Sequence, residues 1–266
     1  MKKNKIGIIG GGNMGEALIK GLVGKKLFAP AGILVCENDF RRAQSLKDKY
    51  RISIKDLNTV IVQTSVVILA VKPQDMEIVL SEIAQSDDKL FISIAAGLTT
   101  KYFEKHLGKA RVIRAMPNMP ALIGEGITAI CKGRYATGLD MREAGRILSA
   151  VGGVLEFQER YLDAITAVSG SGPAYVFLFV EQWMAAAKSL GLREEDAKRL
   201  VLGTLIGSAH LLLKAGLPAD DLRSRVTSKG GTTEAAMKVF LKDNAIGKLM
   251  KDALIAAKKR AQELAK

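Results

Sequence analysis

The chain has 266 residues, of which 48% are hydrophobic and 25% charged, so it can form one large domain or two ordinary ones and is not extensively disordered. The formal net charge of +13 raises the question of nucleic acid, but the basic residues form short scattered groups without a basic arm or interleaved aromatic side chains. We therefore expect a solvated basic surface that attracts small anionic ligands, a small-molecule substrate, and no nucleic-acid partner.

The apolar runs of the sequence are short. Ala174–Val180 is stopped by Glu181 and Gln182, well short of the roughly 20 residues that a membrane-spanning helix needs. The run after the first lysines, Ile6–Ile9, is too short for the apolar part of a signal peptide. These runs predict no membrane partner and a cytoplasmic location.

Few residues of the sequence are suited to metal binding or histidine chemistry. Cys36 and Cys131 have no metal-like spacing, and each lies at the end of an apolar run, as reduced core cysteines do. His106 and His210 are the only histidines. The sequence therefore predicts no metal site and little basis for a Ser-His-Asp triad.

Short apolar runs and helical stretches alternate through the first half of the chain. The expected strands are Ile6–Ile9, Ile33–Cys36, Val66–Val71, Leu90–Ile94, Val112–Ala115 and Gly126–Cys131, and the helices include Glu16–Val23 and Arg41–Tyr50. Strands that are apolar throughout and separated by helices are typical of a parallel sheet covered on both faces. We predict an α/β fold whose residues 1–160 form a Rossmann-like, doubly wound dinucleotide-binding domain.

The second half changes character, because β-like runs disappear after about Glu156. The expected helices are Pro173–Leu190, Arg193–Ala215, Pro218–Val226, Thr232–Leu241 and Ala245–Ala265. Glycines and prolines between these stretches fit helix ends. The prediction is an all-helical substrate-binding and dimerisation domain over residues 161–266.

The segment Leu200–Leu213 is almost free of charge. A helix that is apolar nearly all round must be buried on every side, and a small helical domain cannot easily enclose one alone. Burial in a subunit interface is the favoured interpretation. The alternative is a central helix within the monomer's own bundle.

A glycine-rich turn follows the first expected strand and opens the first helix. Gly10, Gly12 and Gly15 form the pattern G-x-G-x-x-G. Glycines permit a tight turn and a close backbone approach to a pyrophosphate, and the helix N-terminus offers free N–H groups. The pattern predicts a dinucleotide site; the alternative is a glycine-rich turn without a ligand.

The end of the second expected strand should meet the adenosine ribose. An acidic side chain there accepts hydrogen bonds from the ribose hydroxyls of NAD, whereas an arginine favours the 2′-phosphate of NADP. The sequence offers both, as Glu37 and as Arg41 with Arg42, so the choice of cofactor stays open on these residues. The alternative is that the two arginines only form the exposed start of a helix.

Further candidate residues follow the third, fourth and fifth expected strands. They are Ala70-Val71-Lys72-Pro73, Ile94-Ala95-Ala96-Gly97 and Arg114–Pro120. Ligands of open α/β sheets bind at the carboxyl ends of strands, and the three segments share one edge of one sheet. For each segment taken alone, the alternative is an ordinary loop between a strand and a helix.

The helical half contains two polar islands, Ser169–Tyr175 and Ser228–Ala235. Small hydroxyl residues before Pro173 predict a helix N-cap in the first island. Gly230-Gly231-Thr232-Thr233 in the second exposes backbone N–H groups and two hydroxyls, which suit a carboxylate. The alternative for both islands is ordinary capping.

Six motifs in order give the sequence a resemblance to the pyrroline-5-carboxylate reductase family over essentially its full length. They are IGIIGGGNMG (6–15), AVKPQ (70–74), IAAG (94–97), RAMPNMPA (114–121), SGSGPAYVF (169–177) and SKGGTTEAA (228–236). The last two are the most specific, because generic Rossmann enzymes lack them. Lys229 departs from the proline often found before Gly-Gly in the family, which leaves the rigidity of that loop in doubt.

The resemblance implies roles for single residues. It implies pyrophosphate binding by Gly10, Gly11, Gly12, Asn13 and Met14, and a nicotinamide site along Ala70, Val71, Lys72, Pro73, Ile94, Ala95 and Ala96. It also implies substrate binding by Ser171, Gly230, Gly231, Thr232 and Thr233, with the Thr233 hydroxyl facing the substrate nitrogen as the catalytic residue.

The resemblance further implies the reaction, the cofactor and the assembly. The reaction is hydride transfer to the imine carbon of 1-pyrroline-5-carboxylate, which gives L-proline in the last step of proline biosynthesis. The family more often uses NADP, which together with Arg41 and the positive net charge favours NADPH, with NADH still used. Family members are homodimers at least, and some form decamers.

Two rival functions share part of this pattern. A β-hydroxyacid dehydrogenase or imine reductase has the glycine loop but lacks the Gly-Gly-Thr-Thr block. A non-catalytic relative would bind the cofactor for regulation, and the intact substrate loop argues against it.

Overall fold

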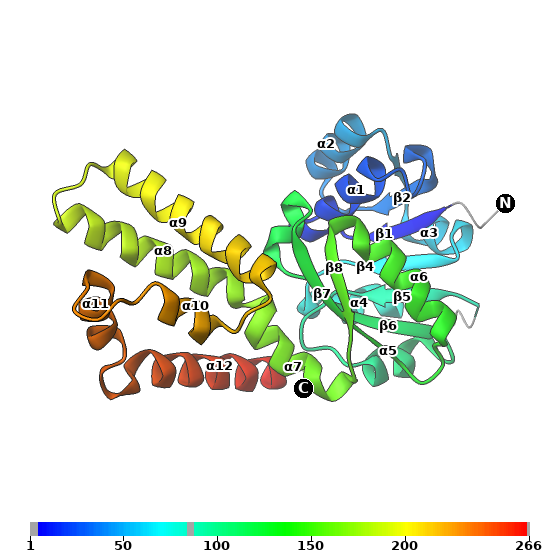
Figure 1. Ribbon diagram of the computed structural model, residues 1–266. Helices are drawn as coiled ribbons and strands as arrows, with labels where there is room; N and C mark the ends of the chain where they lie inside the picture. Colours follow the sequence, from blue (N-terminus) through cyan, green and yellow to red (C-terminus); the bar gives the residue numbers. More distant parts are fainter. Residues whose placement is uncertain (1–4, 84–87, 265–266) are drawn as a thin grey trace. The chain divides into compact units, whose positions relative to one another are not determined.

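The computed structural model describes residues 5–83 and 88–264 and divides into two compact units. The first unit contains the chain up to Pro173 and takes it up again from Ala256 (Figure 1). The second unit is Ala174–Ile255.

An eight-stranded sheet forms the centre of the first unit in the described part of the chain, in the order β3-β2-β1-β4-β5-β6-β7-β8. The strands are β1 (Ile6–Ile9), β2 (Ile33–Cys36), β3 (Ser53–Ile54), β4 (Val66–Leu69), β5 (Leu90–Ser93), β6 (Arg111–Met116), β7 (Gly126–Lys132) and β8 (Gly152–Glu156). Neighbouring strands from β3 to β6 pair in parallel. Only the β6–β7 pair is antiparallel, and β8 runs parallel to β7.

The predicted doubly wound α/β sheet is confirmed, with two strands that the sequence did not predict. β3 has two residues, and β8 begins with two glycines, so neither has the apolar run that predicts a strand. The antiparallel pairing follows from the short link between β6 and β7, which holds the 3₁₀ turn Met119–Ile123. A parallel pair needs a crossover of about a dozen residues or more, and this link is too short.

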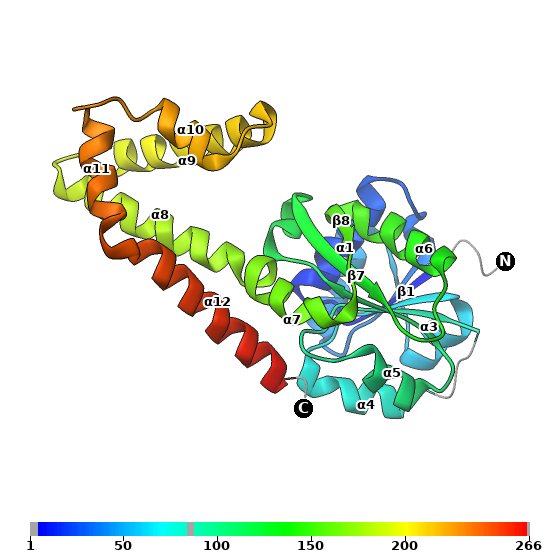
Figure 2. The same cartoon turned by 60° about the horizontal axis from the view of Figure 1, so that its bottom comes forward.

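Helices cover both faces of the sheet, which explains why its central strands are apolar throughout (Figure 2). One buried cluster joins the sheet to α1 (Asn13–Gly24), α2 (Phe40–Tyr50) and α6 (Gly138–Leu148). The other joins it to α3 (Leu57–Gln63), α4 (Met76–Ser81) and α5 (Thr100–Leu107). Ile6 and Ile8 of β1 belong to the first cluster and Ile9 to the second.

The strand order reverses at β1, which lies between β2 and β4. The chain passes from β1 to β2 and β3 on one side, and then returns to place β4 on the other side. Loops after β1 and β4 therefore leave in opposite directions and open a crevice at the carboxyl ends of these strands.

The first unit extends past the domain boundary expected near residue 160 and includes α7 (Leu162–Ile165) and a π-helix, Thr166–Gly170. Leu162 is fully buried against Ala129 and Cys131 of β7, and Asp163 pairs with Arg114 of β6 at 3.0 Å. These contacts hold the start of the helical region on the sheet. The division into functional domains at residues 1–160 and 161–266 stays a prediction.

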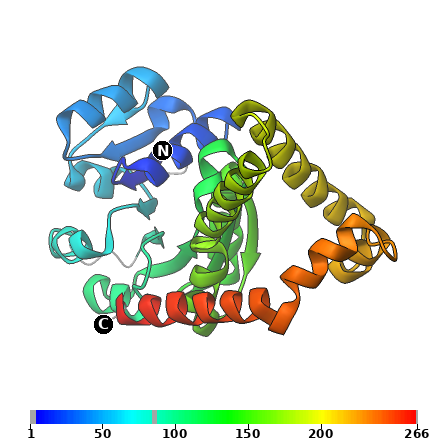
Figure 3. The same cartoon turned by 90° about the vertical axis from the view of Figure 1, so that its left-hand side faces the viewer.

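The second unit is helical, as expected (Figure 3). Its elements are most of α8 (Gly172–Ser189), then α9 (Glu194–Ala215), α10 (Ala219–Arg225), α11 (Thr232–Phe240) and the first part of α12 (Ala245–Leu264). Each expected helix lies within two residues of its predicted ends. Ala265, the predicted last residue of α12, lies outside the described residues.

The helical region exposes much apolar surface in the single chain. Ala197 and Val201 are the buried residues of α9, whereas Leu200, Ile206 and Leu213 are 58%, 53% and 82% exposed. One described segment, Glu159–Ser189, is long and apolar enough to cross a membrane by length and composition alone. A second would qualify if the sharply bent pair α9–α10 were one span. The segment Glu159–Ser189 is longer than the run Ala174–Val180, from which the sequence predicts no span.

Candidate active site

The turn between β1 and α1 requires glycine at Gly10. Its φ of +97° lies in the left-handed region, and a Cβ there would come within 2.7 Å of the Ala70 carbonyl oxygen. Its N–H donates to the Cys36 carbonyl at 2.8 Å, so the turn is fixed between the ends of β2 and β4.

Gly12 and Gly15 serve the same turn in other ways. A Cβ on Gly15 would overlap the Gly10 carbonyl, so the glycine permits α1 to pack closely on the loop. A Cβ on Gly12 would meet no described atom within 4 Å, so this backbone is open to a ligand. Gly12 is also the N-cap of α1, and no side chain among the described residues caps that helix. The first N–H groups of α1 are therefore available to an anion such as a pyrophosphate.

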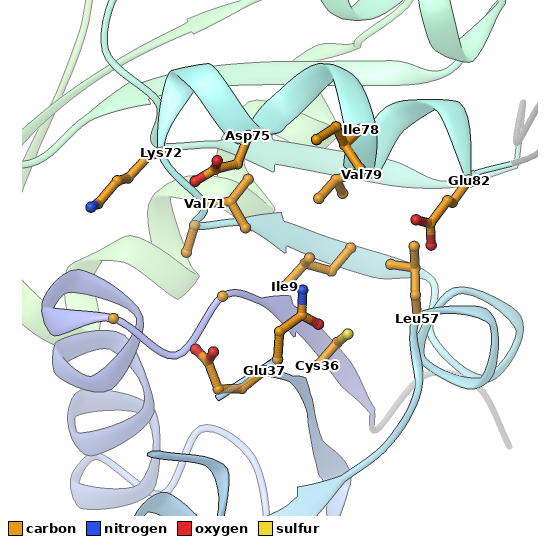
Figure 4. A pocket seen from close by; sticks show the side chains of 14 residues that line it. Ile9, Cys36, Glu37, Leu57, Val71, Lys72, Asp75, Ile78, Val79 and Glu82 are labelled. Atoms are coloured by element: carbon orange, nitrogen blue, oxygen red, sulfur yellow. The ribbon is translucent and has the colours of Figure 1, made fainter. Parts of the chain in front are cut away.

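A cavity of about 430 Å³ opens beside this turn (Figure 4). The site residues expected from the sequence that line it are Gly10, Gly12, Glu37, Ala70, Val71 and Lys72. Residues that line it without having been expected are Ile9, Cys36, Asn38, Leu57, Asp75, Ile78, Val79 and Glu82.

The unexpected lining residues on α3 and α4 add an apolar part to the cavity. Ile78 and Val79 of α4, with Leu57 of α3, present apolar surface there (Figure 4). Such a surface suits a flat aromatic ring such as adenine. Ile78 is 65% exposed although it is apolar, and this appears only in the structure.

Glu37 lies directly after β2 and its carboxylate holds the glycine turn. One oxygen accepts the Gly11 N–H at 2.6 Å, and the other accepts the Asp39 N–H at 2.9 Å. Glu37 is thus fixed at the point where the ribose of a dinucleotide is expected.

The two arginines near Glu37 have different surroundings. Arg42 donates from Nε to the Gly11 carbonyl at 2.7 Å and from Nη2 to Glu16 at 2.5 Å, so its guanidinium supports the turn from the α1 side. Arg41 is exposed. Neither arginine lines the cavity.

Glu16 is the centre of a charged cluster between α1 and α2. It accepts from Lys49 at 2.9 Å and from Tyr50 at 2.8 Å, in addition to Arg42. The hydrogen bond from Lys49, opposed by burial and aided by Tyr50 and Arg42, lowers the pKa of Glu16 to about 2. The cluster fixes α2, and with it Arg42, on the helix that carries the glycine turn.

The Gly-Gly-Thr-Thr segment lies in the second unit, where it forms the start of α11. Gly230 has φ +73° and donates its N–H to Glu234 at 2.8 Å, and Gly231 is the N-cap. In the described chain no side chain caps α11, so the N–H groups of Thr232 and Thr233 are available to a ligand. Thr232 is exposed and Thr233 is half-buried.

Two family models match the chain, one in the sheet region and one in the helical region. Pyrroline-5-carboxylate reductase dimerisation matches residues 159–264, and NADP oxidoreductase coenzyme F420-dependent matches residues 5–97. A pyrroline-5-carboxylate reductase from Mycobacterium leprae is 37% identical over 98% of this chain and 96% of its own length. This chain belongs to the pyrroline-5-carboxylate reductase family.

Solved structures of the family have the same fold. A pyrroline-5-carboxylate reductase from Coxiella burnetii is similar with a TM-score of 0.91 and 37% identity over 100% of both chains. A pyrroline carboxylate reductase from Plasmodium falciparum, solved with NADP bound, is similar with a TM-score of 0.89 and 28% identity, again over 100% of both chains. As a member of the pyrroline-5-carboxylate reductase family, this chain is an oxidoreductase with a dimerisation domain.

The remaining residues that family resemblance assigned to the cofactor lie outside the cavity. Asn13 and Met14 form the first turn of α1, and Pro73 begins a 3₁₀ turn, Pro73–Asp75. Ile94, Ala95 and Ala96 follow β5. The Ile94 N–H donates to the Leu69 carbonyl at 3.1 Å, which holds this segment beside the end of β4. Assignment of Asn13 and Met14 to the pyrophosphate, and of the other residues to the nicotinamide, stays a prediction.

Arg114 has a structural place in this member of the family. It is 3% exposed in β6 and pairs with Asp163 at 3.0 Å and with Glu159 at 3.5 Å. Glu159 in turn accepts the N–H and hydroxyl of Thr100, both at 2.7 Å. Arg114 therefore links the sheet, α5 and the start of the helical region.

The polar island that contains Ser171 does not form the expected N-cap. Ser171 has φ −84° and ψ −19°, which are near-helical angles, and its N–H donates to the Thr166 carbonyl at 2.8 Å. The segment continues from α7 through the π-helix into α8, so the start of α8 at Gly172 is a continuation of helical backbone and not a capped helix end. Gly170 within it lies against Met116 of β6, where a Cβ would come within 2.6 Å of the methionine Cε. Such π-helices are frequent at functional sites.

Proposed function

We propose that this chain reduces 1-pyrroline-5-carboxylate to L-proline with NADPH or NADH, the last step of proline biosynthesis. The observation that carries this proposal is the match to the family over 98% of the chain, which includes both the dinucleotide turn and the Gly-Gly-Thr-Thr segment.

The residues present fit a nicotinamide dinucleotide. Gly12 leaves its backbone open, α1 offers uncapped N–H groups, and the adjoining cavity has an apolar part for adenine. Gly10 to Met14 would hold the pyrophosphate, and Ala70 to Pro73 with Ile94 to Ala96 would hold the nicotinamide end. When bound, the reduced nicotinamide supplies hydride to the imine carbon. The site accommodates NADP, and NAD is also accommodated.

The start of α11 fits the substrate carboxylate. Its uncapped N–H groups and the Thr232 hydroxyl are donors, and the helix N-terminus carries positive partial charge. Ser171 contributes a further hydroxyl to the substrate site. The chain's donors therefore hold the substrate by its carboxylate and leave the ring free for reduction.

Thr233 acts on the ring nitrogen. An imine nitrogen that is already protonated in solution needs no strong acid, so a hydroxyl that holds the nitrogen in place is sufficient. As the carbon gains hydride, the C=N double bond becomes a single bond and the nitrogen keeps its proton. Thr233 accepts a hydrogen bond from that proton and is the catalytic residue.

Substitution of Thr233 tests this role. Thr233→Val should lower kcat by about 10- to 100-fold, because one hydrogen bond to the reacting group is worth about 1–3 kcal/mol. Thr233→Ser keeps the hydroxyl and is the matched control, with kcat within about threefold of the original. The dissociation constant for the dinucleotide should stay unchanged in both variants. Equal kinetics of the valine and serine variants would overturn the assignment.

The proposed reaction is separated from its rivals by one assay. Purified protein is offered NADPH or NADH with the five-membered imine acid and, separately, with its six-membered analogue. Turnover of the five-membered imine acid supports the proposal. Turnover only of other imines or of β-hydroxyacids would indicate a different reductase, and dinucleotide binding without turnover would indicate a non-catalytic relative.

The chain forms a homo-oligomer through its helical region, which matches the family's dimerisation model. We infer a homodimer as the minimal unit, with a decamer built from such dimers as the larger assembly. The partner subunit, rather than lipid, covers the apolar surface of Glu159–Ser189 and of α9, so the enzyme works in the cytoplasm without a membrane partner. Light scattering in buffer without detergent tests this, and a protein that dissolves only with detergent would contradict it.

A further inference from the structure

The charged side chains that line the dinucleotide cavity are mostly acidic. Glu37, Asp75 and Glu82 carry carboxylates, and Lys72 carries the one ammonium among the lining residues. Within the described chain, no arginine lines the cavity. This lining is unfavourable for the additional phosphate that distinguishes NADP from NAD.

Glu37 occupies the position where the two cofactors differ. It follows the last residue of β2, and its carboxylate is held by the N–H groups of Gly11 and Asp39 at 2.6 and 2.9 Å. Each carboxylate oxygen keeps a lone pair for a further hydrogen bond, and the 2′- and 3′-hydroxyls of a ribose are donors. A 2′-phosphate offers only acceptors and negative charge at neutral pH. The same fixed carboxylate therefore binds NADH and repels NADPH.

Arg42 cannot readily compensate for this repulsion. Its Nε is bound to the Gly11 carbonyl at 2.7 Å and its Nη2 to Glu16 at 2.5 Å. Moving it to a phosphate would break both contacts and remove a counter-charge from Glu16. Arg41 is exposed and contributes no side chain to the cavity lining.

The thiol of Cys36, which also lines the cavity, lies in a negative electrostatic potential. Burial raises the pKa of Cys36, and the negative charges of Asp56, Glu37 and Glu82 raise it further. A second anion at the end of β2 meets the same unfavourable potential.

We infer that Glu37 sets the cofactor preference of this enzyme, and that it makes NADH more efficient than NADPH while both are used. The inference rests on the proposed function only for its kinetic readout. The arginines from which the sequence favoured NADPH lie outside the cavity, and Glu37 lies inside it.

Binding and turnover are measured for the full chain and for Glu37→Gln. Dissociation constants for NADH and NADPH are obtained without substrate from the fluorescence of the reduced nicotinamide, and kcat/KM is then measured with the five-membered imine acid. We expect the original chain to bind NADH about tenfold more tightly than NADPH. Glu37→Gln should shift the preference for NADH over NADPH by about 100-fold in both measurements, so that NADPH becomes the preferred cofactor. The substitution removes the repulsion of the 2′-phosphate and weakens the contacts to the ribose hydroxyls.

Two further variants serve as controls. Glu77→Gln removes the same charge from an exposed position on α4 that does not line the cavity, and it should leave the NADH to NADPH ratio unchanged. Glu37→Ser provides a smaller neutral side chain and should shift the ratio in the same direction as Glu37→Gln. Circular dichroism melting verifies that each variant is folded.

The possible outcomes separate the inference from the proposed function. Tighter binding of NADPH by the original chain, or equal shifts in Glu37→Gln and Glu77→Gln, would overturn the role of Glu37. The expected binding ratios without imine turnover would leave that role intact and overturn the proposed reaction. Loss of NADPH binding alone in Arg41→Ala would instead assign the preference to Arg41 and overturn the inference.

Discussion

Gly10 and Gly12 are two residues apart in one turn, but a methyl group would have a different effect at each. At Gly10 it would meet the Ala70 carbonyl at 2.7 Å on a backbone with φ +97°. At Gly12 it would meet no described atom within 4 Å. Gly10 therefore supports the fold, and Gly12 leaves open the space that we propose for the pyrophosphate.

Gly10→Ala should destabilise the protein by about 1–3 kcal/mol, because the new side chain strains the backbone and clashes with β4. Gly12→Ala should leave the free energy of unfolding within about 0.5 kcal/mol of the original and weaken dinucleotide binding at least about tenfold. Urea denaturation and dinucleotide titration measure the two quantities. A similar loss of stability in both variants would contradict the separation of roles.

Some residues of the cavity could be predicted from the sequence, and others could not. The glycines and Glu37 follow a strand at fixed spacing, and that spacing alone brings them to the cavity. The partners of Arg42 depend on how α2 packs against α1, which no local pattern encodes. For the same reason Leu57 and Ile78 could not be assigned to the cavity, since they lie on two helices that meet only in the folded sheet.

At the scale of elements, the contact between α1 and α2 depends on the ionised form of Glu16. Its pKa is lowered from 4.5 to about 2 by Lys49, Tyr50 and Arg42. A carboxyl group with a lowered pKa in the folded state contributes stability above the pKa of the unfolded state. That contribution is complete above pH of about 4.5 and is lost as the pH falls toward about 2.

Glu16→Gln should reduce the acid-induced loss of stability by about 1–2 kcal/mol between pH 6 and pH 3, because the neutral amide has no proton to gain. Urea denaturation at several pH values measures the slope. Glu143→Gln is the matched control, since Glu143 pairs with Arg146 on an exposed part of α6. An unchanged slope in Glu16→Gln would show that the cluster contributes nothing to acid stability.

Elements with a long apolar or helical pattern were predicted correctly, and the exceptions have physical causes. β3 and β8 lack apolar runs, and the short link after β6 imposes the antiparallel direction of β7. Helix α8 starts at Gly172, close to the expected position, but the π-helix Thr166–Gly170 replaces the expected N-cap because the backbone continues past Ser171 in near-helical angles. Contacts of Leu162 and Asp163 with the sheet hold that segment in place.

For the whole molecule, the exposed face of α9 decides between the two interpretations of Leu200–Leu213. A central helix of the monomer's own bundle would be buried, but Leu212 and Leu213 are 43% and 82% exposed in the single chain. The monomer therefore does not enclose this helix, and the dimerisation match provides the other explanation.

Leu212→Glu should dissociate the oligomer and leave the sheet unit folded, because the charge would be buried without a partner only in the assembly. Light scattering should then give a mass near the 28.6 kDa of one chain. Val62→Glu is the control, since Val62 is 56% exposed on α3, outside the dimerisation match at residues 159–264, and it should keep the oligomer. An assembled Leu212→Glu protein would show that this part of α9 is not in the interface.

The sequence by itself determined the class of fold, the glycine turn and the order of helices, because these depend on local spacing and on periodic apolar residues. Its motifs also determined the family, whose members share them over nearly the whole chain. Only the tertiary structure decided that Glu37 and not Arg42 lines the cavity, that Arg114 links sheet to helices, and that α9 is exposed in one chain. Each of these depends on contacts between elements that lie far apart in the sequence, so packing and not local pattern selects the partner.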